Sequence, residues 1–83
     1  MNEEKRIALM GIMIDDAEAV ERVNALLHEH ADGILGRMGL PIRERGVSVI
    51  SVVLDQTNER ISALSGALGR IEGVSVKVSY SKK

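Results

Sequence analysis

The sequence has 83 residues, of which 45% are hydrophobic and 28% charged, proportions typical of a folded globular domain. Cysteine is absent, which excludes disulfides, thiolate metal sites and cysteine nucleophiles. The net charge of −1 gives no general electrostatic reason to expect binding to nucleic acid or to an anionic membrane. No apolar run approaches the roughly 20 residues of a membrane span, and residues 1–6 lack the apolar segment of a secretory signal. We therefore expect one cytoplasmic domain covering residues 1–83.

The first half of the chain predicts a strand followed by a helix. The apolar run from Ile7 to Ile14 has the length of a buried strand, with a helix as the alternative. Asp15 ends this run, and Asp15 and Glu18 have the spacing of a capping box. We expect a helix from about Asp16 to His30, because its apolar residues recur at helical spacing.

A hairpin of two strands is predicted next. Asp32 and Gly33 indicate a turn, and the segment from Ile34 to Ile42 reads as a strand at the edge of a sheet, since Pro41 cannot donate a backbone hydrogen bond. Residues 44–46 form a turn with Gly46 at the position that favours positive φ. The segment from Val47 to Leu54 is rich in β-branched residues and is the clearest strand.

The remaining segments predict a second helix and a last strand. The segment from Asp55 to Asn58 indicates a helix start, and the helix is expected to end near Gly69 or Arg70. Gly73 then makes a turn, and apolar and polar residues alternate from Val74 to Tyr80 as in a half-buried strand.

The resulting β-α-β-β-α-β order, with similar patterns in its two halves, predicts an α+β, ferredoxin-like fold. Right-handed crossovers give an antiparallel sheet with strand order 4-1-3-2 and both helices on one face. One aliphatic face of the central strands is then left without helices, and it suggests an interface in a homodimer or larger homo-oligomer. The sequence leaves open which residues of the third strand lie on it: Val47, Val49 and Val53, or Ser48, Ile50, Val52 and Leu54.

Acidic residues at the two strand-to-helix junctions form the candidate ligand site. We expect the two central strands to run parallel, so that both junctions lie at the same edge of the sheet. Two helix N-termini would then offer backbone donors to a small anionic ligand. The candidate residues are Asp15, Asp16, Asp55 and Gln56. The alternative is that the aspartates only cap their helices.

His28 and His30 are the two histidines, and they supply the alternative function of a metal-sensing regulator. Residues two apart on a helix point to nearly opposite sides, so they cannot chelate one ion together. Two histidines without cysteine also fall short of a zinc ligand set. A partly buried His30 and a solvated His28 are therefore expected, with no resident metal.

Several chemistries lack their sequence signals. No glycine-rich phosphate loop and no local motif of a Ser-His-Asp triad occur. The sequence has no Phe or Trp and one Tyr, so the aromatic platforms of RNA-recognition domains are absent. We therefore expect a protein that is not an enzyme, has no cofactor, and binds neither nucleic acid nor membrane directly.

Three segments of the chain carry a family resemblance. They are residues 37–44 (Arg-Met-Gly-Leu-Pro-Ile-Arg-Glu), the strand from Val47 to Leu54, and the run Leu-Ser-Gly-Ala-Leu-Gly-Arg-Ile-Glu-Gly-Val-Ser-Val-Lys at 64–77. Together they resemble the iron-only hydrogenase system putative regulator family, whose ACT-like fold is also related to the C-terminal domain of the nickel-responsive regulator. The resemblance implies regulation, transcriptional or through enzyme assembly, by sensing a small-molecule effector or docking on a hydrogenase-system protein.

Overall fold

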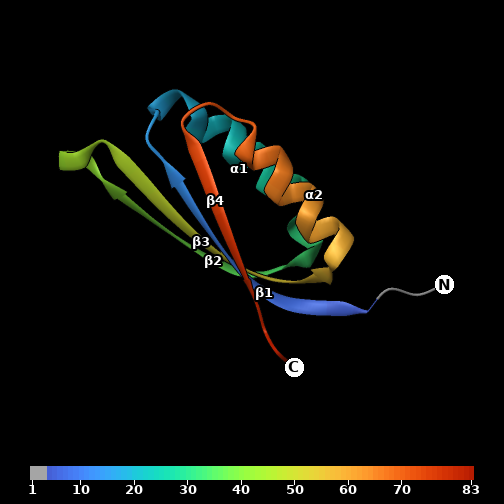
Figure 1. Cartoon of the computed structure of the whole chain (residues 1–83). Helices are drawn as coiled ribbons and strands as arrows, with labels where there is room; N and C mark the ends of the chain where they lie inside the picture. Colours follow the sequence, from blue (N-terminus) through green and yellow to red (C-terminus); the bar gives the residue numbers. More distant parts are fainter. Residues whose placement is uncertain (1–3) are drawn as a thin grey trace.

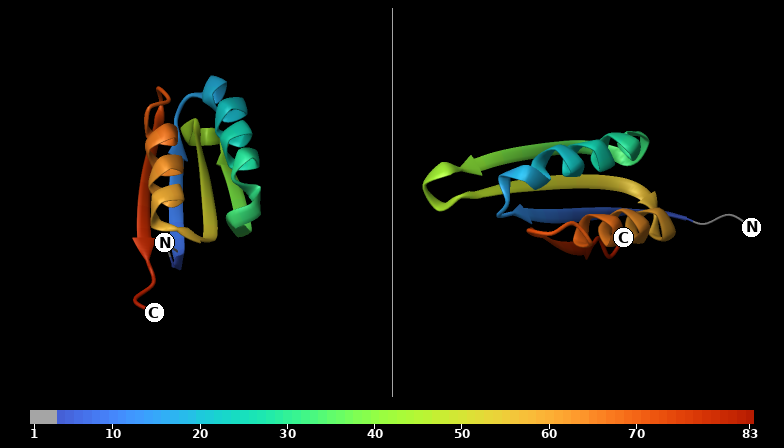
Figure 2. Two further views of the ribbon diagram at one scale, coloured as in Figure 1. Left: turned by 90° about the vertical axis from the view of Figure 1, so that its right-hand side faces the viewer. Right: turned by 90° about the horizontal axis from the view of Figure 1, so that it is seen from above.

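The sheet and helices of the expected fold are all present. The computed structural model describes residues 4–83; residues 1–3, part of the N-terminal segment considered above, lie outside the described residues. The strands β1 (Lys5–Ile14), β2 (Ile34–Ile42), β3 (Val47–Thr57) and β4 (Val74–Tyr80) form one four-stranded sheet. The helices α1 (Val20–Glu29) and α2 (Asn58–Gly69) cover one face of it (Figure 1, Figure 2). Short 3-10 helices stand between elements: η1 (Ala17–Ala19), η2 (Ala31–Gly33) and η3 (Arg43–Arg45).

The strand order β2-β3-β1-β4 confirms the predicted topology. All three strand pairs are antiparallel, and in the central pair Lys5 lies opposite Thr57 while Ile14 lies opposite Ser48. The assumption that the two central strands run parallel is therefore wrong. The physical reason is the connectivity: α1 returns the chain so that β2 runs in the direction of β1, and the tight hairpin turn then reverses β3.

The hydrophobic core lies between the helices and the even-numbered residues of the central strands. Ile50, Val52 and Leu54 of β3 are at most 5% exposed and pack with this core, as do Met10 and Ile12 of β1. Cross-strand partners share a face, so Val47, Val49 and Val53 lie on the opposite, uncovered face. The helices contribute Val23, Leu27, Ile61, Leu64 and Leu68.

The β2–β3 hairpin is closed by η3 and Gly46, whose φ of 67° lies in the left-handed region, as predicted. Figure 2 shows the hairpin extending beyond the N-terminal end of α1. The molecule is accordingly elongated, with principal extents of 46 × 20 × 17 Å. The closed end of the hairpin thus has no helix packed over it.

The helix starts agree in part with the sequence expectation. The first helical segment begins with η1, which Asp16 caps by accepting a hydrogen bond from the Glu18 N–H at 3.0 Å. The second helix begins at Asn58 with Thr57 as its cap. Asn58 lies within the predicted start segment, but Asp55, the first residue of that segment, belongs to β3. It lies there opposite Ile7, because pairing with β1 extends the strand beyond Leu54.

Candidate functional site

The four candidate ligand residues do not form one site. Asp15 and Asp16 follow the end of β1, whereas Asp55 lies opposite Ile7 and Gln56 opposite Arg6, near the start of β1. At the rise of a β-strand, the eight residue-to-residue steps from Ile7 to Asp15 separate the two pairs by roughly 25 Å. A single site joining these residues is therefore wrong, since it depended on parallel central strands.

The Asp15–Asp16 loop is packed against the turn that precedes β4. The Asp15 N–H donates to the Gly73 carbonyl oxygen at 2.8 Å. Gly73 has a φ of 85°, and a Cβ at this position would come within 2.6 Å of the Asp16 Cβ. The Asp16 carboxylate therefore has a structural role as the cap of η1, and the backbone of Asp15 holds the loop against the turn before β4.

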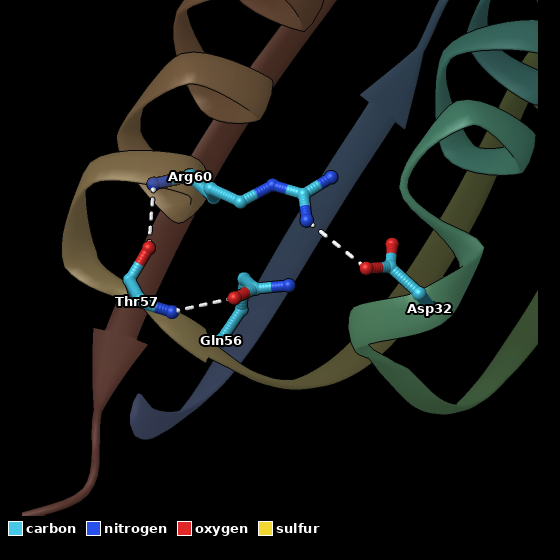
Figure 3. A network of polar contacts seen from close by, with 4 residues as sticks. All are labelled: Asp32, Gln56, Thr57 and Arg60. Atoms are coloured by element: carbon cyan, nitrogen blue, oxygen red, sulfur yellow. Dashed lines mark hydrogen bonds and ion pairs between the residues drawn. The ribbon is translucent and has the colours of Figure 1, made fainter. Parts of the chain in front are cut away.

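Gln56 and its neighbours form a polar network at the other end (Figure 3). Gln56 is 6% exposed, and its Oε1 accepts from the Thr57 N–H at 2.9 Å. Arg60 donates to Asp32 at 3.0 Å, which ties α2 to η2. This hydrogen bond lowers the pKa of the Asp32 carboxyl, and the charge of Arg60 acts in the same direction. The network therefore joins elements that are distant in sequence.

The histidines lie near the end of α1, with His28 exposed and His30 partly exposed, as predicted. Among residues 4–83, no group of three or more His, Cys, Asp or Glu side chains is arranged to hold a metal ion. The geometry around the two histidines therefore adds nothing in favour of the metal-sensing alternative.

The uncovered sheet face carries most of the exposed large hydrophobic side chains of residues 4–83. Seven large hydrophobic residues are exposed in the described chain, and six of them lie on this face by strand register. We call these six residues the open sheet face: Ile7, Leu9, Met13, Met38, Leu40 and Val53. Their exposed fractions of 36–65% correspond to roughly 500 Å² of apolar surface, near the upper end of the largest patch on a typical monomer.

Strand β2 contributes two residues to this face because of a β-bulge, which the alternation of inward and outward side chains along the sequence did not reveal. Ile34, Met38 and Leu40 share one face in a regular strand, but the register shifts between Ile34 and Gly36. Leu35 is the additional residue of this β-bulge. Ile34 consequently packs against the core, whereas Met38 and Leu40 are 65% and 55% exposed. The glycine at position 36 was the only sequence signal for the bulge.

A small α+β protein of the ferredoxin-like fold, with one face of its sheet uncovered, is the class that this geometry defines. The chain belongs to the family described as "TM1266-like: Iron-only hydrogenase system regulator, putative", whose model matches residues 6–78. This confirms the family predicted from the sequence. No curated protein matches the chain significantly.

One solved structure supports the same assignment, and two others share the fold. The chain is 44% identical to the uncharacterized protein TM1266 from Thermotoga maritima, with a TM-score of 0.92 over 95% of this chain and 100% of that one. The C-terminal domain of the MgtC protein from Mycobacterium tuberculosis has a TM-score of 0.70 at 15% identity, covering 99% and 94% of the two chains. The divalent ion tolerance protein CutA1 from Ehrlichia chaffeensis has a TM-score of 0.51 at 13% identity, covering 95% and 84%. The last two likenesses concern the fold alone.

The described residues contain no helix that is both long and apolar enough to cross a membrane.

Proposed function

We propose that this protein is a non-enzymatic regulatory domain of the iron-only hydrogenase system that acts in the cytoplasm as a homo-oligomer, with a homodimer as the basic unit. The family supplies the link to the hydrogenase system and to regulation. The observation that supports the homo-oligomer is the open sheet face, where six large apolar side chains are 36–65% exposed. Exposed apolar patches of this size mark interaction surfaces.

A second copy of the chain is the occupant that fits this face best. The charged residues that share it by register are Lys5, Asp55 and Lys77, which lie around the apolar side chains rather than among them. A weakly charged, aliphatic face is complementary to itself, as a two-fold interface requires. A stable interface buries about 800 Å² per partner, and Val47, Val49, Ser51, Ser75 and Ser79 extend the open sheet face toward that area.

The oligomer is tested by placing a charge on the open sheet face. Leu9 is 50% exposed and lies opposite Val53 and Ser79, so Leu9→Asp adds a carboxylate between the two apposed sheets without disturbing the core. Light scattering after size-exclusion chromatography should give a dimer or larger for the wild type and a monomer for L9D. Ala63→Asp, on the exposed side of α2, is the matched control and should leave the mass unchanged. A monomeric wild type at micromolar concentration would refute the proposal.

The regulatory role is tested in cells that contain the hydrogenase system. Deletion of the gene should change hydrogenase activity or hydrogenase transcript level. The wild-type protein and A63D should restore the original level, whereas L9D should not. Full complementation by a monomeric L9D protein would show that regulation does not need the oligomer, and an unchanged phenotype on deletion would refute the regulatory role itself.

A further inference from the structure

Two adjoining hollows lie on the helix-covered side of the sheet, between the start of α1 and the β2–β3 hairpin. Their volumes are about 250 and 280 Å³. Both are lined by Ile14, Val20, Pro41 and Ser48, so they form one continuous depression, which we call the hairpin groove. The groove exists because the hairpin extends beyond α1 and leaves the last part of its core-side face without helix packing.

The groove combines aliphatic walls with positive charge. Its apolar lining includes Ile14, Val20 and Pro41, which line both hollows. Arg43 lines the smaller hollow and Arg37 the larger one. No acidic residue lines either hollow. The one ion pair within residues 4–83 joins Arg60 to Asp32, so neither groove arginine has a carboxylate partner there. Arg37 donates only to the neutral Asn24 Oδ1 at 2.7 Å.

From this combination we propose that the hairpin groove binds a small aliphatic carboxylate. The carboxylate group pairs with Arg43, and the alkyl chain lies against Pro41, Val20 and Ile14. A guanidinium matches the planar carboxylate geometrically, and burial of the chain supplies the remaining affinity. The proposal deepens the proposed function, on which it rests for any regulatory effect, by naming the chemical class of the effector.

Other anions fit the groove less well. No aromatic side chain lines it, so a nucleotide base would have no stacking partner. A phosphate carries more charge and needs more donors, and the largely apolar walls would leave part of that charge unpaired. A single negative charge at the end of an alkyl chain avoids both problems.

Gly39 keeps the floor of the groove open. It lies opposite Ile50, which faces the helices, and it lines the larger of the two hollows. A Cβ at this position would meet no heavy atom within 4 Å, and its φ is not positive. Position 39 therefore has room for a Cβ, and Gly39→Val projects a side chain into the groove while replacing glycine by a residue that favours strands.

The test is a titration of the full-length, isotope-labelled protein with hexanoate, followed by amide NMR. Hexanoate should shift the amides of Gly39, Gly46 and Ser48 in a saturable way. Arg43→Gln should weaken binding about tenfold, because a charge-assisted pair is lost, and G39V should abolish it. Arg45→Gln, on the same turn but outside the groove lining, should bind like the wild type. Longer carboxylates should bind about three- to fourfold more tightly per added methylene until the groove is filled.

Three results would overturn the proposal: the absence of saturable shifts, equal binding of hexylamine, or unchanged binding in R43Q. If inorganic phosphate bound more tightly than hexanoate, a phosphate site would replace it. Leu40 belongs to the open sheet face and also lines the larger hollow, so the oligomeric state of each variant is measured separately. Loss of hexanoate binding with an intact dimer would refute the groove alone, whereas a monomer that still binds hexanoate would refute the dimer alone.

Discussion

At the scale of single residues, the Asp32–Arg60 pair is the clearest electrostatic contact. Its 3.0 Å hydrogen bond lowers the pKa of Asp32 below the ordinary value of 3.8. For a carboxyl group whose pKa is lowered by folding, the stabilising contribution is fully present at pH values above the pKa of the unfolded state. This contribution is lost as the pH falls through the pKa of the folded state. Because both side chains are substantially exposed, we expect a small contribution that salt screens further.

This contact predicts the titration of one carboxyl group. In the wild type, the carbon chemical shift of the Asp32 carboxyl should titrate with a pKa below 3.8. Arg60→Gln removes the charged donor and should return the midpoint toward 3.8. High salt should also move the Asp32 midpoint of the wild type toward 3.8, because it screens the charge of Arg60. An Asp32 midpoint that does not differ between the two proteins would contradict the contact.

Gly73 gives a second prediction at this scale. Gly73→Ala should destabilise the protein by more than about 1 kcal/mol, because alanine is strained at positive φ and its Cβ would meet Asp16 at 2.6 Å. Urea unfolding followed by circular dichroism measures this loss. Gly69→Ala is the control, since a Cβ there meets nothing within 4 Å, and it should be neutral or stabilising. Equal stability of G73A and the wild type would show that the Asp15–Asp16 loop is not held as described.

At the scale of elements, the start of α2 depends on one side chain. The Thr57 hydroxyl oxygen accepts a hydrogen bond from the Arg60 N–H at 3.3 Å and caps the helix. Thr57→Ala should cost about 1 kcal/mol of stability, as N-cap removal typically does. Thr57→Ser keeps the acceptor and should recover most of this loss in the same chemical denaturation experiment. If T57S were as unstable as T57A, the threonine methyl group rather than the cap would be responsible.

Local signals predicted most element boundaries. The ranges of β2 and β4 agree with the structure to the residue, because turn residues border both segments. β3 continues to Thr57 since β1 provides pairing partners as far as Lys5, a contact that no local pattern reveals.

The prediction that the four candidate ligand residues form one site was wrong for a similar reason. Each acidic residue was recognised at or near a junction, but strand direction decides which junctions meet, and direction is a property of the whole sheet.

At the scale of the whole molecule, the open sheet face should couple folding to association. If two copies unfold together, tenfold more protein should raise the free energy of unfolding by about 1.4 kcal/mol per dimer. Chemical denaturation at several protein concentrations measures this dependence. Val49→Asp, on the uncovered face, should remain folded and lose the dependence. Val52→Asp should prevent folding, because it places a charge at a position that is 0% exposed. A wild-type midpoint that does not change with concentration would contradict coupled dimer unfolding.

Tyr80 provides a natural optical probe of this coupling. It is the one tyrosine of a sequence without tryptophan, and the Arg6 guanidinium lies 4.4 Å from the centre of its ring. Ultraviolet emission of the unlabelled protein therefore reports on a single place, where the first strand meets the last. Denaturation followed by this emission tracks the edge at β4, whereas circular dichroism averages over all elements. Coincidence of the two curves would show that the edge and the core unfold as one cooperative unit, and earlier loss of the tyrosine signal would reveal fraying that begins at β4.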